Sequence, residues 1–180
     1  MLGYDDIDSD EIIPLVKSAD FPVVNDFLKG IGCKLVVKLH PSQDLDRYNL
    51  VNLDHFILLS QQDFANRGMD LYRFMSQCDA LVTDYSSIFV DYLLLDRPIG
   101  FTIDDEDEYL TNRGFSLENP DSYRAGQKIK NIEDLFLFCQ KLVEGVDDFK
   151  SERDRVNGLM NDYRNGHYSQ SLLDFIGLKK

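Results

Sequence analysis

The sequence predicts an α/β fold in which a parallel sheet carries helices on both faces. Three observations support this prediction. Short apolar runs rich in Val, Leu and Ile recur along the chain, as expected of strands buried on both faces. Stretches with helical spacing separate these runs, and the alternation favours parallel strands. The length of 180 residues suits one domain with a sizeable core, so we expect a single domain over residues 1–180.

Four apolar runs are the predicted strands. The first is bounded by glycines before it and by His40-Pro41 after it. The last begins at Pro98, which can stand only at the start of a strand because it lacks the backbone N–H. In chain order the runs are residues 33–39 (CKLVVKL), 55–60 (HFILLS), 80–83 (ALVT) and 98–103 (PIGFTI).

Helical spacing predicts the remaining elements. Asp70 is the expected N-cap of a helix over 70–77, and residues 86–96 (SSIFVDYLLLD) are apolar nearly all round, which predicts a buried helix. The other expected helices span residues 20–29, 132–143, 147–162 and 169–176. Residues 1–20 are expected to be an irregular start and residues 147–180 a helical C-terminal part. Because compact α/β units normally begin with a strand, we expect that an upstream strand is missing from this chain.

Composition excludes several classes of protein. The chain has 19 basic and 32 acidic residues, a net charge of −13, so it lacks the basic surface of a general nucleic-acid binder. No apolar run has the length of a membrane span, and no signal peptide is evident. The three cysteines form no CxxC pair, so we expect core-filling thiols in a reducing cytosol. The three histidines have no metal-ligand spacing, and no metal site is predicted.

Ligands of open parallel sheets bind beyond the carboxyl ends of the strands. A polar cluster, residues 83–87 (TDYSS), follows the third predicted strand there. With Ser86 as N-cap, the amides of Ser87 and Ile88 and the two serine hydroxyls would face one anion, because a helix N-terminus carries free N–H groups and partial positive charge. The alternative is that Ser86 only caps its helix. Neither GxGxxG nor a Walker loop is present.

A second cluster, residues 38–42 (KLHPS), follows the first predicted strand. His40 there can donate to a phosphate or move a proton near neutral pH, or it can be a loop histidine bonded to the backbone. Ser86 or Ser87, His40 and Asp84 also have the residue types of a hydrolase triad. The GxSxG elbow is absent, however, because Asp84 and Tyr85 stand where it needs a glycine.

Two further segments have alternative interpretations. The acidic run of residues 104–108 could attract Mg²⁺, but such a run is more often a solvated loop, which is what we expect here. Arg113, followed by a glycine, is placed to reach a phosphate, and its alternative is a surface ion pair.

Residues 79–101 (DALVTDYSSIFVDYLLLDRPIGF) strongly resemble the CDP-glycerol glycerophosphotransferase family, bacterial enzymes that prime and polymerise wall teichoic acids. VVKLHPS at 36–42 and EYLTNRGFSLE at 108–118 occur in the order expected of that family. The resemblance covers about residues 30–145. It implies a GT-B architecture of two Rossmann-like domains, of which this chain is the C-terminal, donor-binding half.

The resemblance also implies a reaction and a site. An acceptor hydroxyl would attack the β-phosphorus of CDP-glycerol or a related CDP-polyol, and CMP would leave. His40 would be the catalytic residue at the donor diphosphate, with Asp84, Ser86, Ser87 and Arg113 around it. No cofactor is implied. The acceptor would be a lipid-linked polyol phosphate, and the full-length protein would be cytoplasmic and peripheral to the inner face of the cell membrane.

The sequence departs from the family in ways that lead to further expectations. The family's N-terminal domain is absent, so half of the cleft is missing, and we expect this polypeptide alone to bind the donor weakly and to be inactive. Residues 118–122 (ENPDS) replace the family's PGP-like stretch, which affects the expected loop contacts to the donor. Two alternatives stay open. One is half of a GT-B nucleotide-sugar glycosyltransferase or epimerase, and the other is a non-catalytic α/β module.

Overall fold

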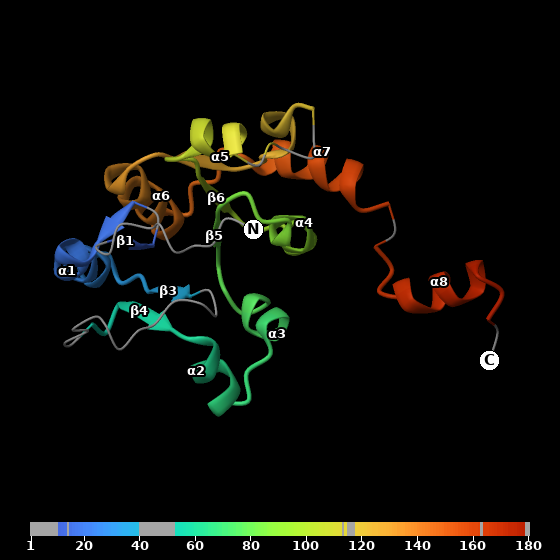
Figure 1. Ribbon diagram of the computed structural model, residues 1–180, viewed down its shortest axis with the longest axis horizontal. Coiled ribbons are helices and arrows are strands. Elements are labelled where there is room, and N and C mark those ends of the chain that lie inside the picture. The colour runs from blue at the N-terminus through green and yellow to red at the C-terminus, as the bar shows by residue number, and fades with distance from the viewer. Residues whose placement is uncertain are drawn as a thin grey trace.

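The computed structural model describes residues 11–13, 15–39, 53–112, 114, 118–162 and 164–178 (Figure 1). Two of the predicted site residues, His40 and Arg113, lie outside the described residues.

The four predicted strands are confirmed. They are β3 (Leu35–Lys38), β4 (Phe56–Leu59), β5 (Leu81–Thr83) and β6 (Ile99–Thr102). β3 pairs with β4 in parallel, and β5 pairs with β6 in parallel. A further strand, β7 (Gln127–Ile129), continues the second sheet beside β6, also in parallel. Within the described ranges the hydrogen bonds therefore define a two-stranded and a three-stranded parallel sheet.

Five predicted helices are also confirmed. Asp70 caps its helix as expected, because its carboxylate accepts a hydrogen bond from the N–H of Arg73 at 2.9 Å. The helices are α1 (Phe21–Ile31), α3 (Leu71–Met75), α6 (Ile132–Glu144), α7 (Lys150–Met160) and α8 (Tyr168–Phe175).

The segment predicted as one buried helix over 86–96 differs from that prediction. It forms a short helix, α4 (Ile88–Tyr92), and a 3-10 turn, η4 (Leu93–Leu95), which ends at Asp96 with a left-handed φ of 49°. Tyr92 and Leu93 are its buried side chains, while Leu94 is 40% exposed. Only some of the apolar side chains of residues 86–96 are therefore buried.

Short elements with polar residues were not predicted. The range expected to be irregular contains an antiparallel hairpin of β1 (Glu11–Ile13) and β2 (Val16–Lys17), within its described part. A helix α2 (Gln61–Asn66) begins at Ser60, whose side chain forms a capping box with Asp63. The acidic run, expected as a solvated loop, instead leads into α5 (Glu106–Asn112). The 3-10 turn η5 (Pro120–Tyr123) precedes β7.

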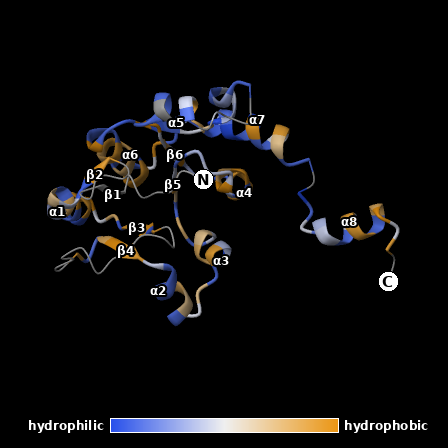
Figure 2. Cartoon of the chain, in the orientation of Figure 1, coloured by the Kyte–Doolittle hydropathy of each residue, from blue (hydrophilic) through white to orange (hydrophobic). Residues whose placement is uncertain are grey.

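Two apolar clusters on opposite faces of the strands form the core. One joins α1, β3, β4 and α6, and the other joins α3, α4, β6 and α7. Successive side chains of a strand point to opposite faces, and β5 shows this directly because Val82 packs on the first cluster and Leu81 on the second. Figure 2 shows hydrophobic residues on β3, β4, α4 and α6 of these clusters, and others on α8, which belongs to neither cluster. The structure thus confirms parallel strands with helices on both faces.

The C-terminal helix α8 extends away from the rest of the chain (Figure 1). None of its side chains is buried, and Phe175 is 88% exposed. Among the described residues, none of the helices is both long and apolar enough to cross a membrane.

Candidate functional site

The candidate site lies where the strands of the three-stranded sheet end. β5 and β6 are parallel, and Thr83 pairs in register with Phe101. Both strands therefore run out at the same edge of the sheet, where ligands of parallel sheets bind. The predicted cluster, residues 83–87, begins at the last residue of β5 and continues beyond it at this edge, and the acidic run follows β6. Topology thus brings together two segments that are about twenty residues apart in the sequence.

Hydrogen bonds within the cluster fix the turn that leads into α4. The carboxylate of Asp84 accepts a hydrogen bond from the N–H of Ser86 at 2.9 Å, and the hydroxyl of Ser86 accepts one from the N–H of Ile88 at 3.4 Å. The N-cap is Ser87, so the prediction of Ser86 as N-cap is wrong by one residue. The side chain of Ser87 makes no capping hydrogen bond.

We call residues 84–87 the β5–α4 turn. Its three predicted residues, Asp84, Ser86 and Ser87, lie together, and all three are exposed to solvent. The long Ile88 bond is the weaker of the two that shape the turn, because 3.4 Å exceeds the usual N–H···O distance. An anion that approached the turn would compete with the Ser86 hydroxyl for this N–H, and the Ser87 hydroxyl would add a second donor.

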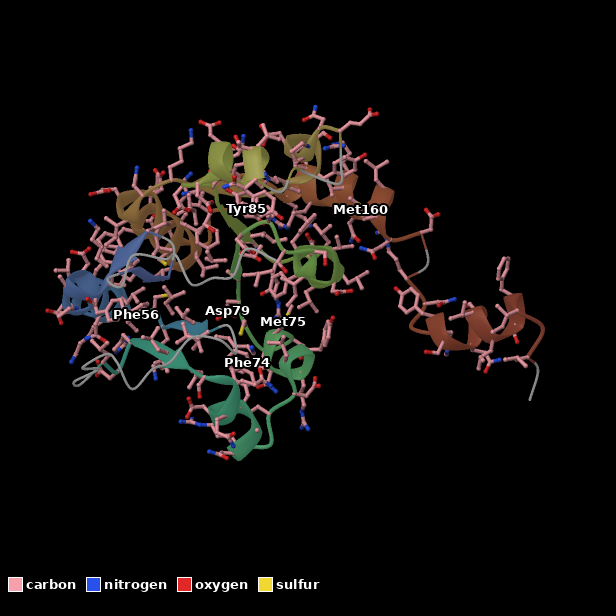
Figure 3. All side chains as sticks on the ribbon, in the orientation of Figure 1. Phe56, Phe74, Met75, Asp79, Tyr85 and Met160 are labelled. Atoms are coloured by element: carbon pink, nitrogen blue, oxygen red, sulfur yellow. The ribbon has the colours of Figure 1, made fainter. Side chains whose placement is uncertain are left out.

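Tyr85 connects the turn to α5. Its hydroxyl donates to the carboxylate of Asp105 at 2.8 Å, and its ring lies 4.1 Å from that of Tyr109. Burial, together with the hydrogen bond to Asp105, raises the pKa of Tyr85 far above its usual range. Tyr85 therefore stays a neutral donor, and it holds the turn against the start of α5 (Figure 3).

Arg124 contacts both the acidic run, residues 104–108, and the ring of Tyr85. Its guanidinium is paired with Glu106 and, at 3.0 Å, with Asp121, and it lies 5.4 Å from the ring centre of Tyr85. The arginine side chain is only 6% exposed, whereas those of Glu106 and Asp121 are 32% and 51% exposed, so water reaches the acidic side of these ion pairs. The acidic run is therefore partly neutralised and helical, which corrects the expectation of a solvated loop. Sequence reasoning gave no role to Tyr85, although it lies within the TDYSS cluster, and it missed Arg124, which belongs to none of the motifs that were singled out.

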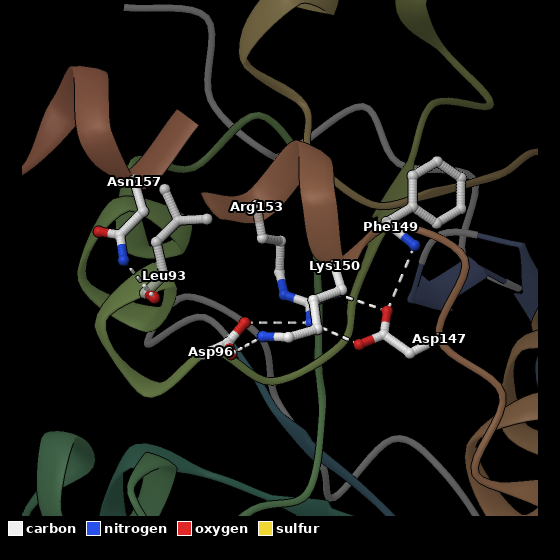
Figure 4. A network of polar contacts seen from close by, with 7 residues as sticks. All are labelled: Leu93, Asp96, Asp147, Phe149, Lys150, Arg153 and Asn157. Carbon is white, nitrogen blue, oxygen red and sulfur yellow. Dashed lines mark hydrogen bonds and ion pairs between the residues drawn. The ribbon is translucent and has the colours of Figure 1, made fainter. Parts of the chain in front are cut away.

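Helix α7 packs against η4 and α4, and Figure 4 shows part of the network that joins them. Asn157 donates to the carbonyl of Leu93 at 3.0 Å, and Asn161 donates to that of Val90 at 3.1 Å. The Leu93 carbonyl also accepts a hydrogen bond from the N–H of Asp96 at 3.2 Å, so Asn157 adds a second donor to it. The amides of Asn157 on α7 and of Asn161, its C-cap, thus tie α7 to η4 and α4.

The same face of α7 carries a buried arginine. Arg153 is 1% exposed, and its guanidinium donates to Asp147 at 2.8 Å and to Asp96 at 3.3 Å (Figure 4). The hydrogen bond from Arg153 holds the pKa of Asp147 below its usual value. Lys150 and Arg153 together do the same for the pKa of Asp96. This network joins the end of η4 to the start of α7.

The other predicted site segment begins at the end of β3. Lys38 lies there with its ammonium 5.9 Å from the ring centre of Phe64, and Leu39 is buried and bonded to the carbonyl of Leu59 at 2.9 Å. His40 follows directly but is outside the described residues, as is Arg113 after α5. The catalytic and cationic parts of the predicted site are thus not described.

Cavities in the described part of the chain lie elsewhere. One of about 20 Å³ is beside Arg153, and one of about 120 Å³ is formed by Leu53 and β4. Neither of these two cavities is lined by the β5–α4 turn, whose Asp84, Ser86 and Ser87 are exposed. No cluster of three or more His, Cys, Asp or Glu in the described ranges is arranged to hold a metal ion.

The fold and the turn define a class of protein, an α/β domain with a candidate anion site at the carboxyl edge of a parallel sheet. The model of the CDP-glycerol:poly(glycerophosphate) glycerophosphotransferase family matches residues 15–178. The chain therefore belongs to that family. The match extends beyond residues 30–145, over which the resemblance was recognised, and includes α8.

Curated and solved relatives agree with this assignment. The teichoic acid ribitol-phosphate primase of Bacillus spizizenii (strain W23) is 28% identical over 145 residues, which are 78% of this chain and 34% of the primase. The wall teichoic acid polymerase TagF superposes with a TM-score of 0.64 at 22% identity over 95% of this chain and 41% of that chain. A TagF variant soaked with CDPG gives a TM-score of 0.55 at 22% identity, over 95% of this chain and 51% of that chain.

These comparisons also show how much of the length of its relatives the chain spans. It spans about a third of the length of the curated primase and about half of the TagF chains. The TagF likeness confirms the predicted fold, with parallel strands covered by helices as in one part of that polymerase.

Proposed function

We propose that this chain is the donor-binding half of a transferase that moves a polyol phosphate from CDP-glycerol, or a related CDP-polyol, to a teichoic-acid-like acceptor. The observation that carries the proposal is the β5–α4 turn at the carboxyl edge of the sheet. Asp84 and Ser86 shape this turn through their hydrogen bonds. Ser87 is the N-cap of α4, and its side chain makes no capping hydrogen bond. Membership of the glycerophosphotransferase family supports the reaction class.

The chemistry of the transfer explains why such a turn is useful. A terminal hydroxyl of the acceptor attacks the β-phosphorus of the donor, and CMP leaves with the electrons of the broken phosphoanhydride bond. Negative charge builds on the phosphate oxygens, so fixed N–H and O–H donors stabilise the transition state. Ser86, Ser87 and the N–H of Ile88 would supply these donors to the diphosphate.

His40 and Arg113 complete the proposed site. His40 follows β3 and would act as the catalytic residue at the diphosphate, donating to an oxygen of the departing phosphate. Arg113 follows α5 and would place a permanent positive charge against the same group. That charge is needed because the described edge is acidic, with Asp84 and the start of α5 close to the turn.

The acceptor and the cellular site belong to the same proposal. The acceptor would be a lipid-linked polyol phosphate, which the full-length protein reaches from the cytoplasmic side of the membrane. The structures of TagF variants soaked with CDPG support a CDP-polyol as the donor of a family member. The excess of acidic over basic residues makes nucleic acid an unsuitable ligand.

Calorimetric titration of the purified chain tests the proposal. We expect CDP-glycerol to bind selectively over UDP-glucose, even at millimolar strength, and Ser87→Ala to weaken binding by about tenfold, which corresponds to about 1.4 kcal/mol for one lost donor to a charged group. Ser169→Ala is the matched control, because Ser169 is an exposed serine on the distant α8. Preference for UDP-glucose would indicate a nucleotide-sugar enzyme instead. Equal binding by both serine variants and the parent chain would overturn the assigned site.

A further inference from the structure

Two of the three cysteines of the chain meet in the first core cluster. Cys33 lies between α1 and β3, and its N–H donates to the carbonyl of Leu28 at 2.9 Å, which folds it back against the last turn of α1. Cys139 is on α6 and is 4% exposed. Both residues pack in the cluster formed by α1, β3, β4 and α6. The sequence places them more than a hundred residues apart, so only the fold brings them together.

Aromatic stacking independently fixes the two elements against each other. The ring of Phe27 on α1 stacks on that of Phe136 on α6, with 4.0 Å between ring centres. Phe136 and Cys139 are three residues apart on α6 and therefore share a face of the helix. That face is turned toward the end of α1, where Cys33 follows. The two side chains pack in the same cluster there, and each perturbs the pKa of the other.

The two thiols differ in pKa because their surroundings differ. The contact with Cys139 lowers the pKa of Cys33 to about 7, aided by the Lys34 backbone and the charge of His55, and opposed by burial and by Asp79. His55 is held there by a 2.7 Å hydrogen bond between its Nδ1 and the carbonyl of Cys33. The same contact with Cys33, together with burial, raises the pKa of Cys139 far above its usual value. Cys33, which is half-buried, is thus the thiol that is both ionised near neutral pH and accessible.

We propose that Cys33 and Cys139 are a redox modification site, in which Cys33 reacts with a small-molecule disulfide and Cys139 then closes an intramolecular disulfide. In the first step the Cys33 thiolate attacks one sulfur of oxidised glutathione, which gives a mixed disulfide and one glutathione thiolate. In the second step the Cys139 thiol loses its proton to solvent and attacks the Cys33 sulfur, which releases the second glutathione. Two protein thiols and one glutathione disulfide become one protein disulfide and two glutathione thiols.

The bond would tie the junction of α1 and β3 to α6 across a loop of about a hundred residues. A cross-link over so long a loop restricts the unfolded chain and stabilises the folded one. β3 leads directly to the segment that contains His40, so the oxidised protein would hold the start of that strand more firmly against the core. The proposal does not depend on the donor-binding function.

Cys78 is the internal control. It lies on the other side of the sheet after α3, where its thiol donates to the carbonyl of Phe74 at 3.5 Å. Burial raises its pKa, so it lacks the ionised state that makes Cys33 reactive.

Treatment of the full chain with oxidised glutathione, followed by peptide mapping without reduction, tests the proposal. We expect a peptide in which Cys33 is joined to Cys139, with Cys78 left as a free thiol. Cys139→Ser should stop at the mixed disulfide on Cys33, Cys33→Ser should leave Cys139 unmodified, and Cys78→Ser should behave as the parent chain. Circular dichroism of each variant would establish that it is folded.

Two results would overturn the proposal. One is a stable mixed disulfide on Cys33 in the parent chain, with no link to Cys139 after long incubation. The other is modification of Cys78 at the same rate as Cys33.

Discussion

Arg153 shows at the scale of one residue how a charged side chain can be buried. Its guanidinium lies between Asp147 and Asp96, whose side chains are 28% and 43% exposed, while Arg153 itself is 1% exposed. Within the part of the chain that the structure describes, its Nε atom has no hydrogen-bond partner. The arginine therefore loses most of its hydration on folding. Its two acidic partners are partly exposed and can still be hydrated if the arginine is removed.

This asymmetry predicts that Asp147→Asn is more destabilising than Arg153→Met. We expect Asp147→Asn to lower the free energy of unfolding by about 2–3 kcal/mol, because it leaves a buried cation with Asp96, at 3.3 Å and partly exposed, as its one remaining carboxylate partner among the described residues. Arg153→Met should lower it by less than about 1.5 kcal/mol, since methionine fills most of the volume and removes the unpaired Nε. Urea denaturation of both variants at neutral pH measures the difference. A larger loss in Arg153→Met would contradict this account of the network.

The same contacts give the stability a dependence on pH. The pKa of Asp147 is lowered in the folded state, so the pair stabilises the protein above the unfolded pKa of about 4. That contribution disappears as the pH falls through the lower folded pKa. Between neutral pH and pH about 3 the parent chain should therefore lose more stability than Arg153→Met, in which the carboxyl has no cation to lower its pKa.

At the scale of elements, the structure requires one glycine and would accept a larger residue in place of another. Gly126 precedes β7, and a Cβ there would lie 2.0 Å from the carbonyl oxygen of Ile99 at the start of β6. The close approach of the two strands therefore requires glycine. Gly30 lies on the exposed side of α1, where a Cβ would have nothing within 4 Å, and its backbone is helical.

We predict that Gly126→Ala lowers the thermal midpoint and that Gly30→Ala raises it. Gly126→Ala must separate backbone atoms of β6 and β7, and we expect a loss of about 2 kcal/mol or more. Gly30→Ala reduces the freedom of the unfolded chain and should gain about 0.5–1 kcal/mol. Thermal denaturation followed by circular dichroism compares the two alanine variants directly. A Gly126→Ala chain as stable as the parent would show that β6 and β7 do not meet as described.

The elements that could be predicted from the sequence share strong local signals. β3, β4, β5 and β6 are apolar runs, and α1 and α6 have regular apolar spacing. The unpredicted strand β7 reads Gln-Lys-Ile, and its position depends on pairing with β6 rather than on its own composition. Tertiary pairing of this kind leaves no local pattern, which is why β7 was missed.

Of the predicted site, the structure describes only the β5–α4 turn, since His40 and Arg113 lie outside the described residues. The β5–α4 turn was located because polar residues follow an apolar run and precede a helix, and the structure gathers Asp84, Ser86 and Ser87 there. Its contacts were not predicted, because Asp105 and Arg124 come from segments that the sheet topology brings to the same edge. Acidic residues 104–108 suggested a loop from composition alone, whereas their ion pair and the contact with Tyr85 stabilise a helix start.

The whole molecule is one part of a larger architecture in its relatives. The chain spans about a third of the ribitol-phosphate primase and about half of the TagF chains. An open turn that offers hydrogen-bond donors from one side would bind a diphosphate weakly, since a dry, enclosed site is what makes such donors strong. The proposed function therefore predicts that the donor binds at the β5–α4 turn with modest affinity.

The most direct test of the central claim is an NMR titration of the isotope-labelled chain with CDP-glycerol, which locates weak binding residue by residue. We predict that the amide signals of Ser86, Ser87 and Ile88 shift progressively and to saturation, with smaller changes along α5 and almost none on α8. Signals that move mainly on other elements, or that stay unchanged at the turn while the donor binds, would contradict the assignment of the β5–α4 turn as the diphosphate site.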